Sequence, residues 1–328
     1  MQSVFITLSV SPLAIVIPIV AFIIISIIGM LIMTMSVAKK QYTNQFVRTS
    51  PEKWARANSC PENAEHCEMY ERGLDWADKV KEFRREVSVT SEGLKLVGEF
   101  FGFGGNKAVI ILSGRAEALE YSYYFAKPYQ ELGYNVLVVD GRAHGLSEGK
   151  YATAGIREQY DVAEWIELLH RDYAVDEVVI HGVCIGSATA IYVAMSANPY
   201  LKAIVLEGPF LSFYNVIKQR TRTAGHPAFP VSEEMVWLFK HWAKADVVKY
   251  RPIKCIRKID TPLLMLCGRE DISSLPAYCE KLFKACKSRR KELVWFERGA
   301  HSHLRIADED KYDASIKEFI KGLKQEVR

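Results

Sequence analysis

Short apolar runs alternate with segments of helical periodicity through most of this 328-residue chain. The runs cover residues 109–112, 135–139, 177–180, 203–206, 263–266 and 292–296. Apart from the first residue of three of them, Asn135, Glu177 and Glu292, the runs are continuously apolar, which is typical of strands buried on both faces. Buried strands that alternate with helices predict a mostly parallel sheet covered by helices on both sides. The predicted fold class is therefore α/β.

The N-terminal segment has a different composition. No charged side chain occurs between residues 2 and 38, and residues 13–37 are dominated by Ile, Val, Leu, Met and Phe. This stretch of about 25 residues exceeds the roughly 20 that an α-helix needs to cross a bilayer. Pro18 and Gly29 are tolerated in spanning helices. We therefore predict a transmembrane anchor over residues 1–38, followed by a polar juxtamembrane linker over residues 39–85.

A cleavable signal peptide is the alternative interpretation of this segment, because Ser36, Val37 and Ala38 resemble a small-residue cleavage site. However, no Lys or Arg precedes the apolar run, and the run is longer than the roughly 7 to 15 apolar residues of a signal peptide. The basic residues that follow it are Lys39, Lys40, Arg48, Lys53 and Arg56. By the positive-inside rule we expect a single-pass protein of the cell membrane with its C-terminal domain in the cytoplasm.

The cysteines fit this compartment. Seven are present, and no C-x-x-C pair occurs among them, which is more typical of reduced thiols than of a disulfide framework. Cys60 and Cys67 flank His66 and could be metal ligands or a bridge. Because a closed zinc site needs about four ligands, we interpret these two cysteines as bystanders.

The alternation of strands and helices is interrupted once within the predicted α/β domain of residues 86–328. Residues 209–256 contain no evident strand, whereas residues 216–220 and 233–242 have helical patterns. The interval is rich in aromatic residues, namely Phe210, Phe213, Tyr214, Phe229, Trp237, Phe239 and Trp242. Aromatic residues at helical spacing usually belong to a core, so this insertion is either part of the ordinary core or a small helical lid over a pocket.

Residues 178–188, Val-Val-Ile-His-Gly-Val-Cys-Ile-Gly-Ser-Ala, carry the strongest chemical signal. An apolar strand leads into Gly-x-Cys-x-Gly and then into a helix, which is the context of a nucleophile elbow. Such a turn would expose Cys184 at the carboxyl end of the sheet, directly before a helix N-terminus. The helix dipole lowers the pKa of a thiol there and helps to hold a developing oxyanion. A buried, inert cysteine is the structural alternative.

Several ordered blocks resemble the α/β-hydrolase family, in particular the bacterial serine-hydrolase branch related to S33-type aminopeptidases. The resemblance extends over about residues 87–323 and includes residues 91–96, 133–140 and 141–149 as well as the elbow. It implies the α/β-hydrolase fold and a catalytic triad in the chain order nucleophile, acid, histidine. Most relatives have a serine at the position of Cys184, so the resemblance leaves the activity of this cysteine open.

The same resemblance assigns the other two members of the triad. Asp271 ends a Gly-Arg-Glu-Asp loop after one apolar run, and His301 ends a Gly-Ala-His loop after the last. His301 would take the proton from Cys184 and return it to the leaving group, while Asp271 would orient the imidazole. Glu270 and His303 are neighbouring alternatives that match the motif less well.

An oxyanion hole of this family uses two backbone N–H groups, which map to Ile185 and Arg115. The second assignment is less direct, because this chain has Ser-Gly-Arg at residues 113–115 where relatives usually have His-Gly and a variable residue. The side chain of Arg115 could also meet an anionic group of a substrate, although a solvated surface arginine is the simpler interpretation. His144 is explained as part of the turn at residues 140–149.

These residues predict a membrane-anchored hydrolase that cleaves an ester, thioester or related acyl bond through a Cys-His-Asp triad and a covalent acyl-enzyme. The anchor and the aromatic insertion favour a small-molecule or lipid-like acyl substrate. The net charge of +4 is spread along the chain and indicates no nucleic-acid partner. We expect neither a cofactor nor a metal. An acyltransferase on the same triad and an inactive binding protein are the alternatives.

Overall fold

The central sheet contains eight strands within the described residues, which are 11–56, 61 and 63–323. In the computed structural model these strands are β1 (Arg84–Ser91), β2 (Leu94–Phe101), β3 (Lys107–Leu112), β4 (Asn135–Val139), β5 (Glu177–Val183), β6 (Leu201–Glu207), β7 (Leu263–Gly268) and β8 (Lys291–Phe296). Their order is β1-β2-β4-β3-β5-β6-β7-β8. β2 pairs antiparallel with β1 and β4, and all other pairs are parallel. The predicted mostly parallel sheet is confirmed, and every apolar run lies in a strand.

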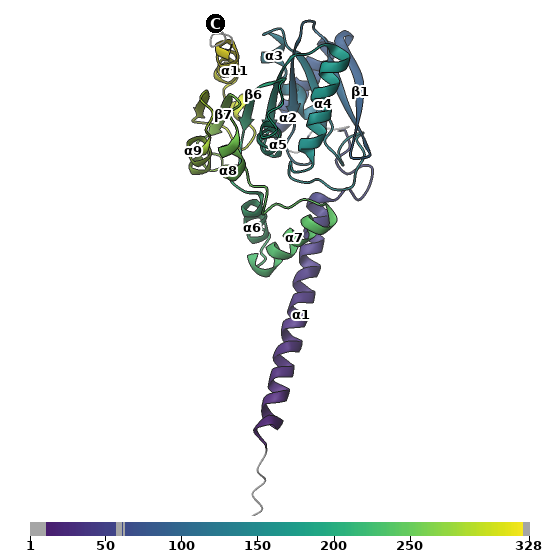
Figure 1. The fold of residues 1–328 in the computed structure, drawn as a ribbon, viewed down its shortest axis with the longest axis vertical. Coiled ribbons are helices and arrows are strands. Elements are labelled where there is room, and N and C mark those ends of the chain that lie inside the picture. Colours follow the sequence, from purple (N-terminus) through teal and green to yellow (C-terminus); the bar gives the residue numbers. More distant parts are fainter. Residues whose placement is uncertain (1–10, 57–60, 62, 324–328) are drawn as a thin grey trace, which may run out of the picture.

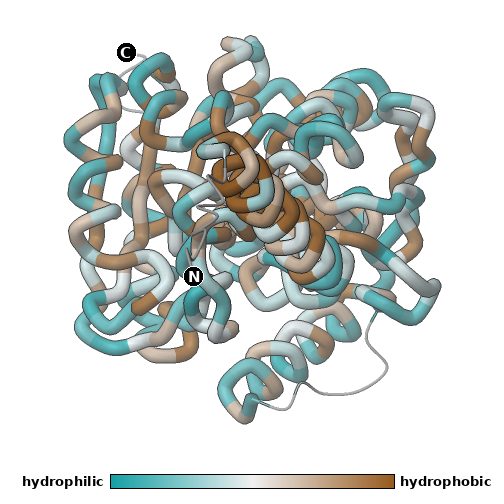
Figure 2. Tube along the Cα trace, turned by 90° about the horizontal axis from the view of Figure 1, so that it is seen from below, coloured by the Kyte–Doolittle hydropathy of each residue, from teal (hydrophilic) through white to brown (hydrophobic). Residues whose placement is uncertain are grey.

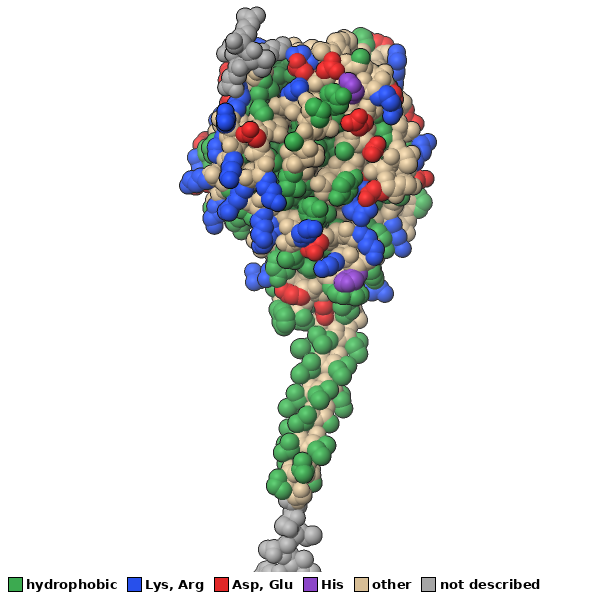
Figure 3. Space-filling view, viewed as in Figure 1, with side chains coloured by type: hydrophobic (Ala, Val, Ile, Leu, Met, Phe, Trp, Pro, Cys, Tyr) green, Lys and Arg blue, Asp and Glu red, His purple; other side chains and the backbone are tan. Residues whose placement is uncertain are grey.

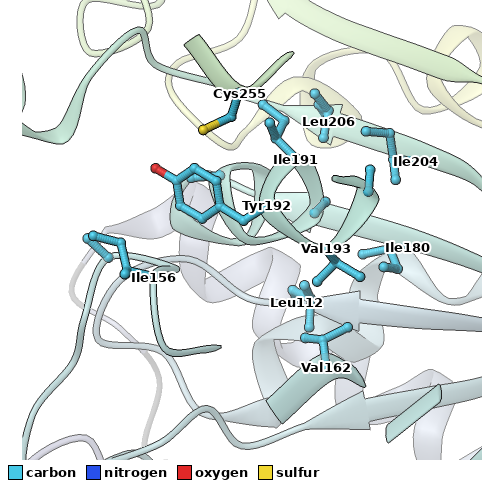
Figure 4. Packing of buried hydrophobic residues seen from close by; sticks show 14 of the residues in the cluster. Leu112, Ile156, Val162, Ile180, Ile191, Tyr192, Val193, Ile204, Leu206 and Cys255 are labelled. Carbon is cyan, nitrogen blue, oxygen red and sulfur yellow. The ribbon is translucent and has the colours of Figure 1, made fainter. Parts of the chain in front are cut away.

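Helices cover both faces of the sheet, which explains why its parallel strands are apolar throughout. In β3, Ile110 belongs to the core on one face, and Val109 and Ile111 belong to the core on the other. The first core is formed with α4 (Glu158–Tyr173), α5 (Ile185–Ala194) and α9 (Pro276–Ala285). Figure 4 shows its packing around Ile191 and Leu206. The second core is formed with α2 (Ala64–Lys79), the 3-10 helix η2 (Leu119–Phe125), α3 (Lys127–Gln130), α10 (Leu304–Ala307) and α11 (Glu309–Leu323).

Helix α1 (Pro12–Phe46) projects from the domain, and its outer part is apolar and exposed (Figures 1 and 2). By length and composition it is the only helix in the described residues that could cross a membrane. Its buried residues are Thr34, Ala38, Tyr42 and Phe46, whose spacing of four places them on one stripe of the helix. This stripe packs on α7 (Ala228–Trp242). The predicted boundary at residue 38 therefore falls inside α1, because the helix continues as a packing surface of the domain.

The segment predicted as a linker contributes structure of its own. Helix α2 packs on η2, and its Trp76 contacts Phe101 at a ring distance of 4.9 Å. Cys67 on α2 is disulfide-bonded, which contradicts the prediction of a reduced bystander. Cys60 lies outside the described residues. The remaining cysteines apart from Cys184, namely Cys255, Cys267, Cys279 and Cys286, are buried free thiols.

The insertion at residues 209–256 forms α6 (Phe213–Thr223), α7 and the short α8 (Pro252–Cys255) between β6 and β7. α6 and α7 lie beside α1 at the end of the domain from which α1 leaves (Figure 1). Phe46 of α1 contacts both Phe213 and Phe239, with ring centroids 5.6 and 4.8 Å apart. The aromatic residues of the insertion thus form a small core that is shared with α1. Phe229 and Trp237 point outward and are exposed.

Candidate active site

Cys184 occupies the sharp turn between β5 and α5. Its φ of +54° and ψ of −107° are unusual for a residue with a side chain, and such strain occurs typically at functional sites. The flanking glycines are required by close packing: a Cβ on Gly182 would collide with the backbone of Gly186, and one on Gly186 would collide with the carbonyl of Leu112. The Gly-x-Cys-x-Gly spacing therefore forms a tight strand-to-helix corner, and the Cys184 side chain is partly exposed there.

The loops after β7 and β8 bring an acid and a histidine together. Oδ2 of Asp271 lies 2.7 Å from Nδ1 of His301. Oδ1 of Asp271 accepts hydrogen bonds from the N–H groups of Ser273 and Ser274, each at 2.7 Å. Burial raises the pKa of Asp271, but these hydrogen bonds and the charge of His301 outweigh it and lower that pKa. A buried carboxylate with fixed partners holds the imidazole in one orientation.

His301 also interacts with Cys184, so the three side chains form a connected set. Burial lowers the pKa of His301, whereas the charge of Cys184 and hydrogen bonds to Asp271 and Cys184 raise it to about 11. The imidazole of His301 therefore stands between the Asp271 carboxylate and the Cys184 side chain. The structure thus brings together the three residues that the sequence singled out.

The two oxyanion candidates flank the same space. Ile185 is the first residue of α5, so its N–H is one of the four that have no acceptor within the helix. Arg115 lies in the loop after β3, where Oε2 of Glu117 accepts the N–H of Gly114 at 2.8 Å and the Ser113 hydroxyl donates to the Glu117 carbonyl at 3.1 Å. Ile185 and Arg115 both line the cavity that contains Cys184 and His301.

That cavity has a volume of about 680 Å³ and is lined by several elements besides the sheet. Its further lining residues include Gln45 of α1, Met69 and Tyr70 of α2, and Phe213, Val216 and Arg220 of α6. Sequence reasoning missed Gln45, Met69 and Arg220, because no local motif marks them and only tertiary packing brings them to the site. The volume suits a small ligand or one acyl chain.

The neighbouring alternatives have other contacts. Nδ1 of His303 lies 3.0 Å from Oε2 of Glu65 on α2. Glu270 is exposed. His144 stacks on Trp54 with ring centroids 4.6 Å apart, and its Nδ1 lies 2.9 Å from the Arg142 carbonyl. The pairing of a carboxylate with the imidazole nearest the elbow is therefore made by Asp271 and His301.

A buried carboxylate behind the site was not anticipated. Glu207 ends β6 and is fully buried, and its side chain accepts hydrogen bonds from the Tyr312 hydroxyl at 2.5 Å and the Leu304 N–H at 3.2 Å. Burial raises the pKa of Glu207 to about 7. The backbone carbonyl of the same residue accepts the N–H of Cys184 at 2.9 Å, so Glu207 supports the elbow from behind.

An eight-stranded sheet of this order, with an elbow after β5 and a histidine after β8, is the α/β-hydrolase fold. A family model described as alpha/beta hydrolase fold matches residues 107–224. The solved structure of the Pyrococcus furiosus esterase Pf2001 matches with a TM-score of 0.62 and 22% identity, over 82% of this chain and 98% of the esterase chain. The chain therefore has the α/β-hydrolase fold, and about a third of its length, residues 107–224, is similar to the family model.

Two relatives known from their sequences are uncharacterised proteins. The uncharacterised protein YqkD of Bacillus subtilis is 25% identical over 225 residues, which is 66% of this chain and 71% of YqkD. An uncharacterised membrane protein of Saccharomyces cerevisiae is 27% identical over 195 residues, which is 58% of this chain and 62% of the yeast protein. The chain thus matches less than two thirds of that yeast relative's length.

Proposed function

We propose that the protein is a membrane-anchored hydrolase that cleaves ester or thioester bonds with Cys184 as the nucleophile. The observation that carries this proposal is the connected set Asp271, His301 and Cys184 at a strained elbow inside a cavity of about 680 Å³. The esterase fold of a solved neighbour is in keeping with it. A special relation to the S33-type aminopeptidase branch stays a prediction.

The chemistry follows from the geometry. The Cys184 thiolate attacks the carbonyl carbon of the substrate, and a C–S bond forms while the N–H groups of Ile185 and Arg115 stabilise the oxyanion. As the C–O or C–S bond to the leaving group breaks, the His301 imidazolium gives its proton to that group. Water then attacks the thioester and gives a proton to His301. The C–S bond breaks, the carboxylic acid leaves, and the Cys184 thiolate and His301 imidazolium are restored. A thioester intermediate is reached more easily from activated acyl compounds than from amides.

Hydrolysis of p-nitrophenyl acetate by the detergent-solubilised full-length protein tests the assignment. Cys184→Ala and His301→Ala should each abolish turnover, and iodoacetamide should label Cys184 selectively in the wild type but not after His301→Ala. Cys255→Ala, at a buried thiol in the core, is the matched control and should leave turnover intact. Turnover that persists in Cys184→Ala would refute the nucleophile.

Two other functions remain candidates for the same site. An acyltransferase would pass the acyl group from Cys184 to an alcohol or amine faster than to water, which product analysis with added acceptors distinguishes. A binding protein without turnover would leave Cys184 without any acyl adduct in the intact mass. The fixed hydrogen bonds of Asp271 favour an enzyme, since binding alone does not require an oriented imidazole.

The membrane placement is part of the proposal. Residues 12–33 of α1 are exposed and apolar, and Lys and Arg side chains gather around the end of the domain next to α1 (Figure 3). The basic flank favours the cytoplasmic orientation predicted from the sequence. The disulfide at Cys67 favours an oxidising compartment instead. Accessibility of cysteines introduced at exposed positions to a membrane-impermeant maleimide in intact cells decides between the two.

The insertion at residues 209–256 is proposed as the lid of the cavity. Helix α6 supplies Phe213, Val216 and Arg220 to the cavity wall, and α7 holds α6 against α1. A lid that packs on the anchor brings the cavity close to the bilayer, which favours a lipid-like acyl substrate.

A further inference from the structure

Two guanidinium groups face the cavity that contains Cys184. Arg115 follows β3 and Arg220 lies on α6, and both line the cavity. Burial lowers the pKa of Arg115, and the positive charge of Arg220 lowers it further. Arg115 is partly buried, whereas Arg220 is exposed at the rim of the cavity. An anion bound between two cations that repel each other is attracted by both.

The charges of Cys184 and Glu117 act on Arg115 and raise its pKa, but no carboxylate among the described residues forms an ion pair with Arg115 or Arg220. Neither Arg115 nor Arg220 forms an ion pair or hydrogen bond with another described residue. Glu117 is the one carboxylate among the described lining residues. Its Oε2 accepts the Gly114 N–H, its Oε1 lies 3.7 Å from Nε2 of His66, and burial raises its pKa toward the neutral acid. Arg115 is therefore balanced only in part by Cys184 and Glu117, and Arg220 has no carboxylate partner among the described residues.

Arg115 and Arg220 lie close to the proposed nucleophile. The charge of Cys184 acts on Arg115, so this guanidinium lies near the nucleophile, and the Arg115 N–H is the proposed oxyanion donor. The remaining wall includes the apolar side chains of Met69, Phe210 and Val216. A guanidinium matches a carboxylate or phosphate in two-point geometry. The site thus combines an apolar surface for a chain with a cationic surface for an oxyanion.

We propose that Arg115 and Arg220 form a subsite for a carboxylate or phosphate group that the acyl substrate carries a few bonds from its reacting carbonyl. The substrate class is therefore an anionic, amphiphilic ester or thioester. This inference rests on the proposed acyl-cleaving function for its kinetic consequence, but the binding of the anion itself does not require turnover.

Replacing Arg220 distinguishes an effect on substrate recognition from an effect on the chemical step. Arg115 could act only by stabilising the Cys184 thiolate, and its replacement would then slow all substrates equally. Arg220 lies on α6, and the charges that act on Arg115 include both Arg220 and Cys184. Arg222 is a matched control, because it is an exposed arginine on the same helix and is not among the residues that line the cavity.

The kinetic arm compares a matched pair of substrates, p-nitrophenyl butyrate and mono-p-nitrophenyl succinate, with the full-length protein in non-ionic detergent. The wild type should prefer the anionic ester, and the ratio of the two kcat/KM values should fall about three- to thirtyfold in Arg220→Gln. The ratio should also fall at high salt, because added ions screen the guanidinium charges. It should not change in Arg222→Gln. An unchanged ratio in Arg220→Gln would overturn the inference.

The binding arm uses the Cys184→Ala variant, which removes the nucleophile, and measures dodecyl phosphate, dodecanoate and inorganic phosphate by calorimetry. Tight binding of dodecyl phosphate that Arg220→Gln weakens supports an amphiphile with a phosphate group. Stronger binding of dodecanoate assigns a carboxylate, and binding of inorganic phosphate alone assigns a free anion rather than an amphiphile. If the Cys184→Ala variant and the Cys184→Ala, Arg220→Gln double variant bind these ligands equally well, the anion subsite is contradicted.

The two arms keep the two proposals apart. Binding that depends on Arg220, without turnover of either ester, would support the anion subsite and contradict the proposed hydrolase activity. Turnover of both esters, without a preference for the anionic ester that depends on Arg220, would support the hydrolase activity and contradict the anion subsite.

Discussion

Gly208 lies directly against the imidazole of His301, so that a Cβ at residue 208 would come within 2.8 Å of Cε1. Gly208 follows β6 with a φ of +59°, a conformation that favours glycine. The loop after β6 therefore sets how close the imidazole can stand to the elbow.

Gly208→Ala should displace His301 and reduce kcat/KM for p-nitrophenyl acetate by at least about tenfold, since small misplacements of catalytic groups cost large factors. Gly225→Ala is the matched control, because Gly225 also has a positive φ, of +77°, but has open space at its Cβ. Both changes strain the backbone by about 1 kcal/mol. Equal activities of the two variants would show that the contact with His301 is unimportant.

Asp271→Asn should lower kcat by about 10²- to 10⁴-fold, because an amide no longer stabilises the imidazolium form of His301. The N–H groups of Ser273 and Ser274 can still donate hydrogen bonds to the amide oxygen of Asn, so the loop should stay folded. Glu270→Gln changes the exposed neighbouring carboxylate and should retain activity. A large loss in Glu270→Gln with none in Asp271→Asn would reverse the assignment of the acid.

Glu207 should make the stability of the fold depend on pH. Its pKa is raised from 4.5 to about 7 by burial, so the folded state holds its proton over a range in which the unfolded state has released it. The free energy of unfolding should therefore fall as the pH rises from 4.5 to 7, by about 3 kcal/mol, and then level off. Glu207→Gln should lack this component, so its melting temperature relative to wild type should be higher at pH 8 than at pH 5. A pH-independent difference would contradict the buried acid.

The contact between α1 and helix α7 of the insertion should contribute to stability. Tyr42 is fully buried, and its ring contacts Phe239 at 4.9 Å and Trp242 at 5.8 Å. Tyr42→Ala should destabilise the fold by about 3 to 5 kcal/mol through the cavity that it leaves. The hydroxyl of Tyr42 has no hydrogen-bond partner in the described structure, so Tyr42→Phe should be neutral or stabilising. Thermal unfolding of both variants in detergent checks the pair, and a Phe variant as unstable as the Ala variant would show that the hydroxyl matters.

The parts of the structure that the sequence predicted are those with a local physical signature. Strands β3 to β7 are buried on both faces and therefore have largely continuous apolar sequences, whereas β8, at the other edge of the sheet, is only partly buried although its sequence is also apolar. Strand β1 lies at the sheet edge and is largely exposed, so it has no such run and its antiparallel pairing with β2 was not anticipated. The elbow at Cys184 was predictable because its glycines meet a steric requirement within a few residues. Arg220 and Gln45 were not, because their place in the cavity depends on how α6 and α1 pack.

In the proposed membrane placement, Thr34, the first buried residue of α1, marks the end of the segment that lipid can surround. The exposed residues 12–33 rise about 33 Å along the helix axis, close to the roughly 30 Å of a hydrocarbon layer. Gln45 lines the cavity only about 17 Å farther along the same axis. Because the same continuous helix contains the exposed segment and Gln45, a tilt of α1 turns the cavity opening by the same angle. In the proposed membrane placement, bilayer thickness, which affects the tilt of a spanning helix, would thereby set the orientation of the cavity relative to the membrane surface.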